Sequence, residues 1–236
     1  MLPREKSVLG ILTFSYLLAV ATSLPPQSLL GAVLFTVAYA THLLTFDPIF
    51  YGRKWSRIIA LLGINTAPYL ISMAFDRGDF VVYGAGALLL AAYLWLMRMG
   101  LGRSVQGVII GTALLSYTFI IGKAMLMHSI ALKDVALALF FIGYHVSTAY
   151  YVESRLAFRK VSPLWSSAAW LLTLATTLPL WWALVIPALE PSVKFLLNTV
   201  KNVKVSRHED IVKMGWRELA RSALLTALLG AAYYLA

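Results

Sequence analysis

Two short segments of the chain combine one carboxylate with several basic side chains, a composition suited to binding an anion. The first reads TFDPIFYGRKWSR, with Asp47, Arg53 and Lys54, and the second reads YYVESRLAFRK, with Glu153, Arg155 and Arg159. Guanidinium groups bind phosphate oxygens through paired hydrogen bonds. Magnesium ions at a diphosphate are held by carboxylates, and each segment offers only one. We therefore expect these six residues to bind an anionic headgroup, and we expect no metal site.

Two histidines offer a second kind of chemistry. His42 and His145 lie in different predicted spans, each in the cytoplasmic half of its span, so they could share one depth in a membrane. Two histidines at one depth are what a b-type haem needs as axial ligands. A lone histidine in such a stretch also serves as an interhelical hydrogen-bonding residue. Both interpretations stay open at this point.

Ionisable and polar residues inside apolar stretches are costly and mark candidate sites. Glu190 and Lys194 are one helical turn apart, which predicts an ion pair on one helix face. This pair could merely neutralise two charges, or it could line a polar cavity. We expect Lys123 to extend its ammonium to the outer surface and Asn65 to bond a neighbouring helix.

The composition shows what kind of element must position these residues. The 236 residues are 60% hydrophobic and 13% charged, and the mean hydropathy is +0.78. Soluble domains are about half apolar and a quarter charged. Apolar runs such as residues 81–96 are uninterrupted, unlike the alternating strands of a membrane barrel. The expected fold class is therefore all-α, a polytopic transmembrane helical bundle.

About nine spans are expected. Six of them cover residues 7–23, 27–46, 58–74, 80–97, 105–126 and 132–152. The apolar stretch 164–200 is too long for one crossing, because about 20 residues suffice. A turn at Thr176, Thr177 and Pro179 would divide it into two spans, and residues 219–234 form the ninth.

The basic residues set the orientation of this bundle. With nine spans, nearly all of them fall on one side, and only Arg77 and Lys133 lie in loops of the other side. Because cytoplasmic loops are rich in lysine and arginine, the N-terminus is expected in the cytoplasm and the chain in the cell membrane. The same charges could act only as topology signals that attract anionic lipid. The net charge of +10 does not indicate a nucleic-acid partner, because the basic residues lie in short clusters between apolar runs.

The chain is expected to form one integral membrane domain, residues 1–236, with a topological repeat. Residues 1–98 and 99–201 make two four-helix repeats, followed by a basic cytoplasmic loop, 202–218, and a last helix, 219–236. A shift of about 103 residues places His42 on His145. The two anion-binding segments then correspond, each following the second helix of its repeat.

This arrangement resembles the UbiA superfamily of intramembrane prenyltransferases, which carry aspartate-rich motifs in the same two loops. The chain has that architecture without those motifs. The segments AYYVESRL and KVSRHEDIVKMGWRELARSALLTALL resemble the YwiC-like family of uncharacterised membrane proteins. The family's His-Gly-Ala-Trp motif is absent from the corresponding stretch, LPREKSVLGIL.

These resemblances and residues together give the expected function. We expect a polar cavity facing the cytoplasm that binds an isoprenoid or other anionic lipid, either without catalysis or as a degenerate prenyltransferase. The alternative is a membrane subunit of a redox or respiratory complex, with b-type haem on His42 and His145, and a small-solute transporter is third. Expected partners are membrane lipids and subunits of a membrane complex. The absence of cysteine excludes disulfides and cysteine-ligated iron–sulfur clusters.

Overall fold

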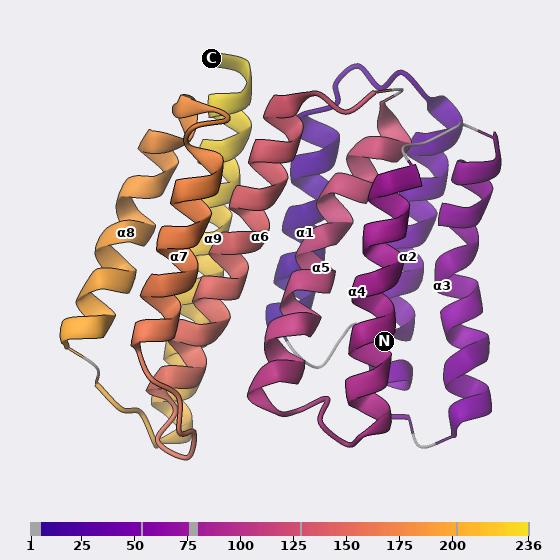
Figure 1. The fold of residues 1–236 in the computed structure, drawn as a ribbon. Helices are drawn as coiled ribbons and strands as arrows, with labels where there is room; N and C mark the ends of the chain where they lie inside the picture. Colours follow the sequence, from indigo (N-terminus) through magenta and orange to yellow (C-terminus); the bar gives the residue numbers. More distant parts are fainter. Residues whose placement is uncertain (1–5, 53, 76–79, 128, 202, 236) are drawn as a thin grey trace.

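The computed structural model describes residues 6–52, 54–75, 80–127, 129–201 and 203–235, and this part of the chain is helical (Figure 1). It contains α1 (Lys6–Ala21), α2 (Leu29–Phe50), α3 (Trp55–Phe75), α4 (Phe80–Arg98), α5 (Val105–Leu126), α6 (Leu132–Arg155), α7 (Leu164–Thr177), η1 (Trp182–Leu184), α8 (Val185–Val200) and α9 (His208–Leu235). The described ranges hold no β-strand, only a single backbone bridge between Leu156 and Val205. The all-α fold class is confirmed.

Six helical segments of the described chain are long and apolar enough to cross a membrane. They are α2, α3, α4, α5, α6 and the segment Trp182–Val200, which joins η1 to α8. The apolar helix α1 has 16 residues, and α7 has 14, or about 21 Å of rise. The fold is thus that of a membrane-spanning helical bundle.

The long apolar stretch 164–200 is divided as its turn residues predict. Helix α7 ends at Thr177, whose carbonyl accepts hydrogen bonds from the backbone N–H groups of Leu180 (3.1 Å) and Trp181 (3.0 Å). The short helix η1 follows, and α8 then begins at Val185. The two resulting helices lie side by side (Figure 1).

The last helix is longer than the sequence predicts. Helix α9 begins at His208, so most of the segment expected as a basic loop, 202–218, is helical. Glu209 and Asp210 occupy its first turn, where negative charge is favoured by the helix dipole. This early start places Glu218 on a helix inside the bundle.

Consecutive helices run in opposite directions, so the odd-numbered helices all begin at one end of the bundle (Figure 1). We call this end the basic end, because most basic residues of the described chain gather there. They include Lys6, Lys54, Arg57, Arg98, Arg103, Arg155, Arg159, Lys160, Lys201, Lys204 and Arg207. At the opposite end, the described lysines are Lys123 and Lys133.

Helices α5 and α6 form the centre of the bundle, α5 packing on α1, α2, α4 and α6, and α6 packing on α5, α7 and α8. Two glycines allow close approach. A Cβ added at Gly122 of α5 would lie 2.1 Å from the Phe35 ring, and one at Gly143 of α6 would lie 2.1 Å from Thr173 Oγ1. A larger residue at either position would force the helices apart.

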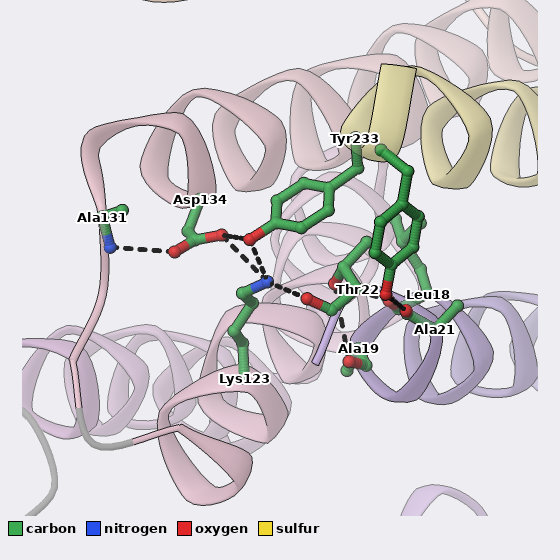
Figure 2. A network of polar contacts seen from close by, with 9 residues as sticks. Leu18, Ala19, Ala21, Thr22, Lys123, Ala131, Asp134 and Tyr233 are labelled. Atoms are coloured by element: carbon green, nitrogen blue, oxygen red, sulfur yellow. Dashed lines mark hydrogen bonds and ion pairs between the residues drawn. The ribbon is translucent and has the colours of Figure 1, made fainter. Parts of the chain in front are cut away.

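Lys123 does not reach the outer surface as expected, and this prediction was wrong. Its side chain is fully buried, and Nζ donates hydrogen bonds to the Thr22 carbonyl (2.6 Å) and to Tyr233 Oη (2.8 Å), and lies 2.9 Å from Asp134 Oδ1 (Figure 2). Asp134 also accepts from the Ala131 backbone N–H at 2.8 Å. An ion pair and its hydrogen bonds thus join α5, α6, α9 and the end of α1.

Candidate functional site

A cavity of about 1030 Å³ lies inside the bundle, with walls from α1 to α6 and from α9. Most of its wall is apolar, including Leu12, Phe46, Leu90 and Leu115. It follows α5 from Gly107 to Ile121, or about 21 Å at 1.5 Å per residue. A cavity of this size and length fits a long apolar molecule better than a small solute.

Four of the five described charged residues that line this cavity lie at the basic end. Lys6 comes from the start of α1, Arg103 from the α4–α5 loop, Glu153 from the end of α6, and Arg159 from the α6–α7 loop. Glu153 Oε2 and Arg159 Nε lie 2.9 Å apart, as an ion pair without the alignment of a hydrogen bond. Three cations and one carboxylate thus line the basic end of the cavity, and Arg159 is the cation that pairs with Glu153 among the described residues.

Local structure holds these basic side chains in place. The chain turns after α4 at Gly100, whose φ of 73° is readily adopted only by glycine. This turn places the Arg103 guanidinium over the ring of Tyr51, 4.9 Å from its centroid. Arg159 Nη2 donates a 2.8 Å hydrogen bond to the Arg103 carbonyl. The two arginines are therefore fixed to each other.

The structure brings together only part of the predicted anion-binding set. Glu153 and Arg159 line the cavity. Arg155 turns away from it, because its guanidinium donates to the Val203 carbonyl and to Tyr151 Oη. Lys54 is exposed, and Asp47 is half-buried; neither is among the residues that line the cavity. Arg53 lies outside the described residues.

His42 and His145 both line this cavity, from α2 and α6. His42 Nε2 lies 3.2 Å from Tyr69 Oη, and its Nδ1 has no hydrogen-bond partner among the described residues. His145 is only 3% exposed, and its buried Nε2 has no partner in the described part either. Each ring thus keeps one nitrogen unpaired, and haem ligation by this pair stays a prediction.

Glu190 and Lys194 do not form the predicted ion pair, and each binds α9 instead. Lys194 Nζ lies 2.9 Å from Glu218 Oε2 and donates to Thr148 Oγ1 at 3.1 Å. Arg221 pairs with Glu190 at 3.0 Å and with Glu218 at 2.6 Å. The prediction failed because a neighbouring helix offered better-placed partners than the next turn of the same helix. Glu218, which lines the cavity, joins both cations.

Sequence reasoning missed three charged residues of this site, and Lys6, the first of them, was counted only as a topology charge. Glu218 was assigned to a cytoplasmic loop, although its i, i+3 spacing to Arg221 is a helical signal. Arg103 was counted only as a topology charge, and no motif distinguishes it. The prediction for Asn65 is confirmed, since its Nδ2 donates to Thr45 Oγ1 of the neighbouring helix α2 at 2.6 Å.

The described residues contain no group of three or more histidine, aspartate or glutamate side chains placed to hold a metal ion. Comparison with known proteins adds no assignment: no family model, no curated protein and no solved structure matches the chain. The cavity and the charged residues that line it are therefore the features that bear on function.

Proposed function

We propose that the chain is a nine-span membrane protein of UbiA-like architecture, with a cytoplasmic N-terminus, that binds an anionic isoprenoid lipid in its central cavity. The observation that carries this proposal is the pairing of a long apolar wall with a cluster of cations at one end. The wall accommodates a hydrocarbon chain, and Lys6, Arg103 and Arg159 offer charge-assisted hydrogen bonds to a phosphate.

The orientation follows from the charge distribution. The basic end carries most of the described lysines and arginines, which favours its placement in the cytoplasm. The lipid headgroup would then lie at the cytoplasmic surface, and its chain would extend along α5 into the bundle. The alternating direction of the nine described helices supports nine crossings, with α7 extended by its flanking turns (Figure 1).

The proposed function is lipid binding and does not include prenyl transfer. Transfer of the UbiA type depends on several carboxylates that hold metal ions against a departing diphosphate. Among the described residues, Glu153 is the one carboxylate that lines the basic end of the cavity, and Arg159 already neutralises it. These charged groups favour the binding of an anionic headgroup over the departure of a diphosphate leaving group.

The test compares geranylgeranyl phosphate with geranylgeraniol on the purified full-length protein, by native mass spectrometry. Arg159→Ala and Arg103→Ala each remove a contact worth about 1.5–3 kcal/mol, so phosphate affinity should fall at least tenfold while alcohol affinity holds. Lys54→Ala and Arg155→Ala are matched controls, because neither side chain lines the cavity. Equal binding of both lipids by the wild type and all four variants would refute the proposal.

The second candidate is a haem-binding subunit of a redox assembly. The observation in its favour is that His42 and His145 line one cavity, each with an unpaired ring nitrogen in the described part. Against it, Tyr69 already bonds one nitrogen of His42. A reduced-minus-oxidised visible spectrum of the purified protein decides between the two.

A further inference from the structure

The cavity wall contains a second group of polar residues, far from the basic end. His145 and Thr148 contribute to it from α6, and Glu218 and Ser222 from α9. Lys194 connects the two helices, because it bonds both Thr148 Oγ1 and Glu218 Oε2. We call these four cavity-lining residues the inner polar group.

The inner polar group lies deep in the bundle. His145 is eight residues before Glu153 on α6, or about 12 Å along the helix axis. Glu218 is ten residues from the start of α9, or about 15 Å from the basic end. A phosphate held by Arg103 and Arg159 cannot reach this depth, so the inner polar group must face another part of the ligand.

Within this group, the His145 side chain has a buried nitrogen that lacks a hydrogen-bond partner among the described residues. Its Nε2 is buried without a hydrogen-bond partner in the described part of the chain, and its ring packs against Phe141 (4.5 Å between centroids) and Tyr144 (5.2 Å). His42 also keeps one unpaired nitrogen, Nδ1, but it lies on α2 with Tyr69 beside its Nε2, outside the inner polar group. A buried polar atom without a partner is costly, and a hydrocarbon chain beside it offers no relief.

The charges around His145 indicate the kind of group that would relieve this cost. Glu218 and Glu190 are balanced by Lys194 and Arg221 through contacts of 2.6–3.0 Å. An additional ionic group at this depth would be uncompensated within the bilayer. A neutral hydroxyl or carbonyl satisfies an imidazole nitrogen without adding charge, since neutral histidine can donate or accept.

We infer that the ligand of this cavity carries a neutral hydroxyl or carbonyl about 12 Å from its anionic head, and that His145 binds this group. The inference rests on the proposed function, and it names the ligand class more narrowly: an amphiphile with a second, internal polar group. Thr148, three residues after His145 on α6, and Ser222, four residues after Glu218 on α9, are further hydroxyl groups of the same cavity wall.

The test uses three alkyl phosphates of equal chain length and the full-length protein. One is unsubstituted, one has a hydroxyl about 12 Å from the phosphate, and one has its hydroxyl at the far end of the chain. In competition measured by native mass spectrometry, the wild type should prefer the internally hydroxylated probe about tenfold, the effect of one satisfied buried hydrogen bond. The other two probes should bind comparably.

His145→Phe keeps a ring of similar size and should abolish this preference while leaving the unsubstituted probe bound. His145→Leu serves as a second variant if the first does not fold. His42→Phe is the matched control, because its ring lines the same cavity from another helix, α2, and contacts Tyr69. It should keep the preference.

The outcomes separate this inference from the proposed function. If the unsubstituted probe binds in an Arg159-dependent manner but the hydroxyl has no effect, the inference is wrong and the proposed function stands. A preference that survives in both His145 variants also overturns it. If no alkyl phosphate binds the wild type, both are refuted.

Discussion

Replacing Lys123 tests how the bundle around the cavity is held together. Its ammonium contacts Asp134, Tyr233 and the Thr22 carbonyl within 2.9 Å, and its side chain has no solvent exposure (Figure 2). Lys123→Met would leave the Asp134 carboxylate buried, with the Ala131 N–H and the Tyr233 hydroxyl as its remaining donors among the described residues. Breaking one partner of a buried pair costs about 3–5 kcal/mol. We expect a loss of that size in the free energy of unfolding.

The double variant Lys123→Met with Asp134→Leu gives the decisive comparison. Removing both charges leaves no uncompensated ion, so the double variant should be more stable than either single variant. The assay is unfolding in mixed micelles at increasing denaturing detergent, followed by circular dichroism. Lys133→Met is the control, since Lys133 only stacks over the Tyr233 ring at 4.1 Å. A cost below about 1 kcal/mol for Lys123→Met, or additive effects in the double variant, would refute the reasoning.

Three further predictions concern the second charge network, the topology and haem. Glu218→Gln should lower the free energy of unfolding by about 2 kcal/mol or more, and by more than Glu190→Gln, because Glu218 pairs with both Lys194 and Arg221 whereas Glu190 pairs with Arg221. Equal costs in the same unfolding assay would contradict this. The chain has no cysteine, so a single introduced cysteine reports the topology of its position. Gln27→Cys should react with an impermeant thiol reagent added to intact cells, and Lys201→Cys should not. The reverse labelling would show that the orientation is inverted. Under the haem alternative, the purified protein should show a reduced α-band that His42→Ala or His145→Ala removes, and a colourless folded preparation excludes it.

The ionisable residues in the bundle are arranged in two neutral groups. Lys123 balances Asp134 near the end opposite the basic end, and Lys194 and Arg221 balance Glu218 and Glu190 near the middle. Each group joins α9 to helices that precede it in the chain. Charge pairing therefore contributes to attaching the last helix, whose early turns line the cavity.

Hydropathy and turn residues were sufficient to predict most of the helices. The length of the apolar stretch 164–200 required a break, and Thr177 and Pro179 marked its position correctly. These features are local, because a helix satisfies its backbone hydrogen bonds within its own segment. The same reasoning holds for α2 to α6, which begin and end near their expected positions. The early start of α9 was missed, because its first turns are charged and exposed, and hydropathy does not distinguish such turns from a polar loop.

Partnerships between side chains depend on tertiary structure, and here the sequence was insufficient. Lys194 has Glu190 one turn away, yet it binds Glu218, 24 positions further along. Arg155 and Arg159 are also one turn apart, but only Arg159 lines the cavity, because Arg155 bonds the loop that follows α8. Sequence determined which segments enter the membrane, since that depends on length and hydropathy. Only helix packing decided which polar groups meet, since a buried charge pairs with whichever partner the neighbouring helices present.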